Sequence, residues 1–254
     1  MTFCLGMIVE EGIVGIADSR LTSGNEIITA KKVSVYQQGQ GSFFIMTSGL
    51  RSLHDKTITY FEEVLAGRPD RPDRPEPCER LFKVVNLFAD QIRRVSREDK
   101  EALSESNLSF DICGLIGGQL EHDKDHLLYL VYPQGNWVEI GRGTPYQIIG
   151  SPAYGKPVLD RTLKYEDSLR FALKVGCLAF DSTRISAADV DYPIDVVIYG
   201  KNSYHITEHR YSKHDLAPIS DWWQDRLRNS VRDLPAEWID RVFMNVLPAA
   251  DRVT

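Results

Sequence analysis

The order of its apolar segments constrains the fold of this chain more than any other feature. Predicted strands are short apolar runs bounded by turn residues, over residues 3–9, 13–17, 32–36, 42–48, 109–116, 127–132, 137–140, 147–149, 194–199 and 204–208. Predicted helices carry apolar residues at spacings of three and four, over residues 50–65, 78–103, 153–163 and 168–180. Strands and helices therefore come in groups rather than alternating one by one, which disfavours a doubly wound parallel sheet.

The predicted strands are mostly apolar at nearly every position, as in residues 3–9 (FCLGMIV). Such strands are typical of a sheet that is covered on both faces. Together with the grouping of the elements, this pattern predicts an α+β fold. Its architecture is a four-layer αββα sandwich, in which two mostly antiparallel sheets face each other and a helix pair covers the outside of each sheet.

We expect two parts in the chain of 254 residues, a core over residues 1–212 and a C-terminal helical extension over residues 213–254. The extension contains three tryptophans, at positions Trp222, Trp223 and Trp238. These side chains are expected either to pack on the core of the same chain or to cover a neighbouring subunit.

Two polar segments are predicted to be loops. Residues 68–77 (RPDRPDRPEP) hold four prolines among charged residues, which excludes a regular helix and predicts a surface loop. Residues 21–30 include Ser23-Gly24-Asn25, a typical turn composition, and are predicted to be a loop as well.

Composition excludes several classes of protein. Lysine plus arginine is 30 and aspartate plus glutamate is 36, so the formal charge of −6 offers no attraction to nucleic acid or anionic lipid. No apolar run approaches the ~18 residues of a membrane span, and the N-terminus lacks the basic region of a secretory signal, so we expect a cytoplasmic protein. The cysteines share no CxxC spacing and are predicted to be reduced thiols rather than disulfides or metal ligands: Cys4, Cys78, Cys113 and Cys177.

The histidines do not indicate a metal site. His122 and His126, like His205 and His209, are four residues apart, a spacing that suits metal binding only on a helix. The second pair lies on or beside a predicted strand, where residues four apart are separated by ~13 Å. We therefore expect surface histidines, no metal and no cofactor, because phosphate-binding glycine motifs and the GxSxG nucleophile motif are absent too.

Several residues that are able to take part in catalysis lie near the N-terminus. If Met1 is removed, Thr2 carries a hydroxyl beside a free α-amine, whose unperturbed pKa of ~8 lies close to working pH. Such an amine is a general base that activates the hydroxyl of its own residue. A nearby Lys32 ammonium would keep this amine neutral, and Asp18 would keep Lys32 charged and oriented.

Gly49 follows a predicted strand and precedes a predicted helix, so its backbone N–H can stabilise a developing oxyanion. Each of these residues also has a structural explanation. Asp18-Ser19-Arg20 is an ordinary turn composition, Lys32 fits an edge of a sheet, and Thr2 fits a frayed terminus. If Met1 is retained, the free amine belongs to the wrong residue and the general base is lost.

In this order the residues resemble the proteasome β-type family of N-terminal-nucleophile hydrolases, and most closely its bacterial Anbu (ancestral β-subunit) branch, which is related to the HslV peptidase. The resemblance extends over about residues 2–210. Besides Thr2 and the apolar strand behind it, it is carried by residues 15–20 (GIADSR), 31–33 (KKV), 46–49 (MTSG), 149–151 (IGS) and 179–183 (AFDST).

The resemblance implies a role for each matching residue. Thr2 becomes the nucleophile, Asp18 and Lys32 its charged partners, and Gly49 the oxyanion donor. Ser151 and Asp181 correspond to residues that bond near the threonine amine, and Ser182 and Ser19 are candidates to support them. Lys31 is the alternative to Lys32, because the lysine comes slightly early, and Arg184 stands where the family has a second serine.

Three functions are compatible with this resemblance. The first is a self-assembling threonine peptidase or amidohydrolase, active on peptides or proteins inside a homo-oligomeric ring or open spiral. The second is a catalytically silent or very weak oligomeric scaffold, and the third is an amidase for a small amide. The sequence does not show whether an ATPase unfoldase is a partner, and residues flanking Thr22, Lys31 and Met46 are expected to shape the substrate pocket.

Overall fold

The computed structural model describes residues 2–23, 26–67 and 78–243. Three of the expectations above therefore lie outside the described residues: the fate of Met1, the surface loop at residues 68–77 and the end of the C-terminal extension. The four cysteines are free thiols; two are buried and two are half-buried. None of the described helices combines the length and the apolar character that crossing a membrane requires.

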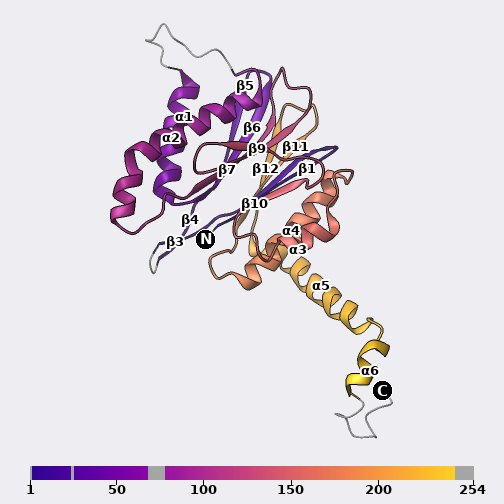
Figure 1. The fold of residues 1–254 in the computed structure, drawn as a ribbon. Helices are drawn as coiled ribbons and strands as arrows, with labels where there is room; N and C mark the ends of the chain where they lie inside the picture. Colours follow the sequence, from indigo (N-terminus) through magenta and orange to yellow (C-terminus); the bar gives the residue numbers. More distant parts are fainter. Residues whose placement is uncertain (1, 24–25, 68–77, 244–254) are drawn as a thin grey trace. The chain divides into compact units, whose positions relative to one another are not determined.

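Two five-stranded antiparallel sheets form the centre of the fold (Figure 1). The order in the first sheet is β10 (Tyr146–Gly150), β1 (Phe3–Val9), β2 (Gly12–Asp18), β11 (Ile194–Gly200) and β12 (Ile206–Tyr211). The order in the second sheet is β5 (Val33–Gln38), β6 (Gly41–Gly49), β7 (Ile112–Gln119), β8 (Leu127–Val131) and β9 (Trp137–Glu139). The two sheets contact each other through β1, β10, β6, β7 and β8.

Helices cover the outer face of each sheet. Helices α1 (Arg51–Ala66) and α2 (Leu81–Glu105) pack against β6, β7 and β8 of the second sheet. Helix α4 (Leu169–Ser186) packs against β1 and β2 of the first sheet, and α3 (Lys156–Thr162) packs against α4. The structure therefore confirms the predicted four-layer sandwich.

Strand β6 shows why the sequence of the strands is apolar at nearly every position. Phe44 and Met46 enter the core between the two sheets, whereas Phe43 and Ile45 enter the core beneath α1 and α2. Successive side chains of a strand point to opposite faces, so a strand that lies between two cores needs apolar residues at both odd and even positions. All four side chains are almost completely buried.

Two local predictions are corrected. Residues 21–30, expected to be a loop, contain most of a two-stranded sheet of β3 (Arg20–Ser23) and β4 (Glu26–Thr29), in which Arg20 pairs with Thr29. A local pairing of this kind, between two strands of four residues each, is not visible in the periodicity of the sequence. The last strand was expected at residues 204–208, but β12 begins only at Ile206, because Tyr204 has a positive φ of 52° and belongs to the turn.

The C-terminal part of the chain is a separate compact unit. The chain divides into units of residues 1–215 and 216–254. Helix α5 (Lys213–Arg232) begins in the first unit and continues into the second, which also contains α6 (Glu237–Phe243). Trp222 and Trp238 of this second unit are largely exposed.

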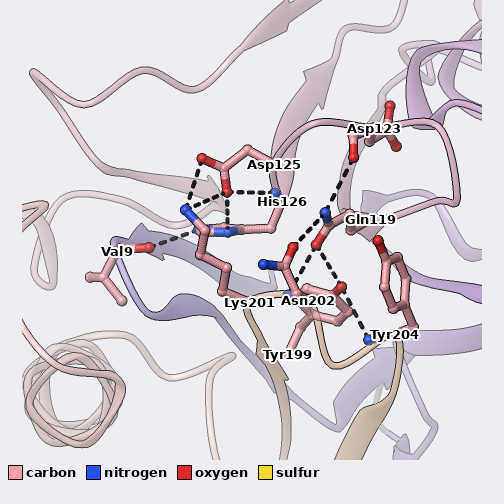
Figure 2. Close-up of polar contacts among 9 residues, drawn as sticks. All are labelled: Val9, Gln119, Asp123, Asp125, His126, Tyr199, Lys201, Asn202 and Tyr204. Carbon is pink, nitrogen blue, oxygen red and sulfur yellow. Dashed lines mark hydrogen bonds and ion pairs between the residues drawn. The ribbon is translucent and has the colours of Figure 1, made fainter.

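Hairpin turns of both sheets are joined by a polar cluster in which Gln119, Tyr199 and His126 are buried (Figure 2). The Gln119 side chain at the end of β7 accepts a hydrogen bond from the Tyr199 hydroxyl (2.8 Å) and donates one to the Asn202 side chain (3.0 Å). His126 Nε2 donates to the carbonyl oxygen of Val9 at 2.8 Å. His126 was expected at the surface, but its side chain is fully buried, with Nε2 hydrogen-bonded to this backbone acceptor and Nδ1 at 2.8 Å from Asp125 Oδ1.

Candidate active site

Backbone hydrogen bonds hold Thr2 at the start of β1. The carbonyl oxygen of Thr2 accepts the N–H of Ser151 at 2.8 Å, and the next residue, Phe3, pairs with Gly150 of β10. Thr2 is only 6% exposed. The Phe3 ring contacts the Phe180 ring of α4, with their centroids 6.0 Å apart. The segment that was expected either to carry the nucleophile or to fray is therefore packed and ordered.

A buried ion pair lies directly behind Thr2. Lys32 Nζ is 2.8 Å from Asp18 Oδ1 and 2.7 Å from the carbonyl oxygen of Arg20. The same Asp18 oxygen accepts the backbone N–H of Phe3 at 2.8 Å. One carboxylate oxygen thus joins the Lys32 ammonium to the residue that follows Thr2, and the Lys32 and Asp18 side chains are only 6% and 0% exposed.

Burial and charge act in opposite directions on Asp18. Burial raises the pKa of the Asp18 carboxyl, because a charged carboxylate loses its hydration. The Lys32 ammonium and the N–H of Phe3 oppose this rise, because both stabilise the charged form. Lys31, the alternative lysine, bonds instead to Glu208 of β12 at 2.5 Å, and both of these side chains are half-exposed.

A cavity of about 200 Å³ opens beside Thr2, and Lys32, Thr47, Ser48 and Gly49 contribute to its wall. Gly49 ends β6 two residues before α1 begins, as the sequence indicated. Its φ of +116° is a conformation that only glycine adopts readily, and a Cβ there would overlap the carbonyl oxygen of Asp111.

The remaining residues with expected roles lie in different surroundings. Asp181 of α4 is almost fully buried and forms an ion pair with Arg184 at 2.8 Å. The Ser182 hydroxyl donates to the Leu178 carbonyl oxygen of its own helix at 2.9 Å. The Ser19 hydroxyl donates to Asp195 Oδ2 of β11 at 3.1 Å. The hydroxyls of Ser182 and Ser19 therefore have partners other than the Asp18–Lys32 pair, and their supporting roles stay predictions.

One side chain in the cavity wall was not expected from the sequence. His54, in the first turn of α1, lines the cavity, and its Nδ1 atom is hydrogen-bonded to the Thr47 hydroxyl of β6. Burial lowers the pKa of the His54 imidazole below its ordinary value of 6.5. The helical periodicity of residues 50–65 identifies the buried face of α1 but does not indicate that a residue beside this face reaches the cavity.

Among the residues that the structure describes, no group of three or more histidine, cysteine, aspartate or glutamate side chains is arranged to hold a metal ion. The chemical groups at the cavity include hydroxyls, the Lys32 ammonium paired with Asp18, an imidazole, and further charged side chains of Lys31, Arg51 and Asp55.

The four-layer fold, with two facing antiparallel sheets and helices on both outer faces, is consistent with the proteasome β-type class of structures. Solved structures of Anbu proteins have the same fold over nearly the whole chain. Anbu from Hyphomicrobium sp. strain MC1 is 28% identical, with a TM-score of 0.83 over 92% of this chain and 98% of that one. Anbu from Yersinia bercovieri is 26% identical, with a TM-score of 0.83 over 92% of this chain and 97% of that one.

The Anbu complex from Pseudomonas aeruginosa, solved as a helical assembly, is 26% identical, with a TM-score of 0.83 over 98% of this chain and 99% of that one. No protein-family model matches the sequence, and no curated protein matches it either. The chain fits the Anbu family within the proteasome β-type class, as its sequence motifs indicated.

Proposed function

We propose that this protein is an N-terminal-threonine hydrolase that cleaves peptide or other amide bonds, with Thr2 as the nucleophile after removal of Met1. The observation that carries the proposal is the shared Asp18 oxygen, which binds both Lys32 Nζ and the N–H of Phe3. This arrangement fixes a buried positive charge next to the residue whose amine must stay neutral to act as a base.

In the acylation step the Thr2 α-amine takes the proton of the Thr2 hydroxyl while Oγ1 attacks the carbonyl carbon of the substrate. The oxygen of the resulting tetrahedral intermediate carries a negative charge, which the N–H of Gly49 and the Lys32 ammonium stabilise. The carbon–nitrogen bond then breaks, and the α-ammonium returns its proton to the leaving amine. An acyl ester on Thr2 remains.

Water completes the cycle by the same route. The α-amine removes a proton from a water molecule, whose oxygen attacks the ester carbon, and the Thr2 oxygen leaves and regains a proton from the α-ammonium. Ser151 supports both steps through its backbone N–H, because the bond to the Thr2 carbonyl fixes the direction of the N-terminus. Asp181 is proposed to lie near the amine as a further charged group.

We also propose that the protein assembles with copies of itself, so that the cavities face a shared space that admits peptide or protein substrate. Two observations support assembly: the Pseudomonas aeruginosa relative forms a helical assembly, and the C-terminal unit exposes large apolar side chains. The most exposed are Trp222, Val231, Leu234, Trp238 and Val242. The proposal gives no role to nucleic acid, membrane, metal or cofactor.

A second candidate function is a silent scaffold of the same fold. It is favoured by the ion pair between Asp181 and Arg184, because this arginine stands where the family has a serine. A carboxylate that is paired with an arginine shifts the pKa of a nearby amine less than an unpaired carboxylate does.

Intact-mass measurement with a peptide epoxyketone or a β-lactone tests the choice between the two functions. The proposal predicts a mass without Met1, one adduct per chain, and loss of the adduct in the Thr2→Ala variant. Retention of Met1, or cleavage of peptides that survives Thr2→Ala, contradicts the threonine mechanism. An adduct without cleavage of any oligopeptide favours the third function, an amidase for a small amide.

A further inference from the structure

Most of the residues that line the cavity beside Thr2 carry charged or hydroxyl side chains. Beyond the residues named above, its lining includes Lys31, Arg51 and Asp55, and the described lining residues include no large aliphatic or aromatic side chain. Met46, near which a pocket residue was expected, is fully buried in the core between the sheets.

Positive charge exceeds negative charge on this wall. Lys32 forms a buried ion pair with Asp18. The side chains of Lys31 and Arg51 are about half-exposed, so a ligand can reach them. Their present partners are Glu208 at 2.5 Å and Asp55 at 3.2 Å, of which only Asp55 belongs to the cavity wall. Exposed pairs of this kind contribute only ~0–1 kcal/mol, so a bound anion can replace either carboxylate.

His54 adds a donor whose charge depends on pH. Its Nδ1 is held by the Thr47 hydroxyl, while Nε2 is 3.8 Å from Asp55 Oδ1. The charges of α1 that act on this imidazole are those of Asp55, Arg51 and Glu62, and burial outweighs them and lowers its pKa. The ring is therefore neutral at pH 7, and protonation below pH 6.5 adds a positive charge to the cavity.

We propose that the cavity binds a substrate side chain that ends in a carboxylate, with Arg51 and Lys31 as its charged partners and His54 as a further donor. The inference rests on the proposed function, because it takes Thr2 as the group that reacts with the carbonyl next to this side chain. The substrate class is thus a peptide or amide with an acidic residue on the acyl side of the cleaved bond.

Matched peptide epoxyketones that differ only in the residue next to the epoxyketone test this inference. We expect adduct formation on Thr2, measured by intact mass, to be up to about 5-fold faster for glutamate than for the nearly isosteric glutamine, because this factor corresponds to the upper limit for an exposed charge pair. Leucine and lysine probes are expected to react more slowly than both. Equal rates for glutamate and glutamine, or a fastest rate for leucine, would overturn the proposal.

The pH dependence of the glutamate-to-glutamine ratio separates a charge effect of His54 from a structural one, because a purely structural role would not make the ratio depend on pH. Titration of the α-amine affects both probes alike and cancels in the ratio, and a glutamate side chain with a pKa of ~4.3 stays ionised at pH 5.5. The glutamate-to-glutamine ratio is therefore expected to be larger below the lowered pKa of His54, where the imidazole is charged, than at pH 8. In His54→Asn this difference disappears, whereas His122→Asn, at an exposed histidine outside the cavity, keeps it.

A matched pair of arginine variants tests the charge itself. Arg51→Gln is expected to lower the glutamate-to-glutamine ratio and to leave only the contribution of Lys31 and His54. Arg97→Gln removes the same charge from an exposed position on α2 and is expected to leave the ratio unchanged. A ratio that does not change in Arg51→Gln would contradict the assignment of this side chain.

Failure of the proposed function is distinguishable from failure of this inference. If none of the probes modifies Thr2, the nucleophile is wrong, and the cavity is tested by binding alone. Capped peptide amides ending in glutamate or glutamine are titrated into the Thr2→Ala variant, and the NMR signals of the His54 ring report binding. Tighter binding of the glutamate peptide supports the inference, and equal binding overturns it.

Discussion

Removing the buried ammonium of Lys32 gives the most informative test of the site. In Lys32→Met, the Asp18 carboxylate, which has no exposed surface, loses its cationic partner at 2.8 Å and keeps only backbone hydrogen bonds from Phe3 and Arg20. Removal of one member of a buried ion pair costs ~3–5 kcal/mol, because the other charge is left without compensation. We expect a loss of this size in the free energy of unfolding, measured by urea denaturation at pH 8 and constant protein concentration.

The sequence provides a control one residue away. Lys31→Met removes the same charge and adds the same side chain, but Lys31 pairs with Glu208 at a half-exposed position. The expected loss is ~0–1 kcal/mol, as for other surface pairs. A double variant, Asp18→Asn with Lys32→Met, removes both buried charges and is expected to regain part of the stability that the single variant loses.

The direction of the pH dependence follows from Asp18. Burial already raises the pKa of this carboxyl and Lys32 opposes the rise, so the pKa rises further in Lys32→Met. The folded variant then binds a proton more tightly than the unfolded chain, and its stability decreases as the pH rises through the folded pKa. The loss relative to the parent protein is therefore smaller at pH 5 than at pH 8. A Lys32→Met variant as stable as Lys31→Met at pH 8 would refute the reasoning.

Three further predictions concern other parts of the fold. Gly49→Ala forces an alanine into a φ of +116° and against the Asp111 carbonyl oxygen, so urea denaturation should show a loss of at least ~1–3 kcal/mol in the free energy of unfolding. Gly143 has open space around it, so the stability of Gly143→Ala should stay close to that of the parent protein. Burial lowers the pKa of His126, so its contribution is present above pH 6.5 and is lost as the pH falls through the folded pKa. His126→Gln should flatten the pH dependence of thermal stability in that range, and an unchanged slope would contradict this. Phe44→Ala should cost ~3–5 kcal/mol by the same urea assay, since its ring is fully buried between the sheets; a loss below ~1 kcal/mol would be inconsistent with that packing.

The sequence was sufficient for the layers of the fold because their signals are local. A strand buried on both faces must be apolar at both parities, as Phe43, Phe44, Ile45 and Met46 show, and a helix on one face of a sheet needs only one apolar stripe. The grouping of these elements then excluded alternating α/β folds. The β3–β4 pair was missed because two strands of four residues carry no periodicity that distinguishes them from a loop.

At the site, the sequence supplied the residue types and their order, and a family resemblance supplied their roles. Only the tertiary structure decided which lysine faces Asp18, because Lys31 and Lys32 are neighbours whose side chains diverge, one to Glu208 and one into the interior. The tertiary structure alone brought His54 and Arg51 to the cavity beside Thr2. These two residues belong to α1, which covers the second sheet, whereas Thr2 precedes β1 of the first sheet. Contacts between residues about fifty positions apart depend on how the layers are stacked, and local propensity does not encode that stacking.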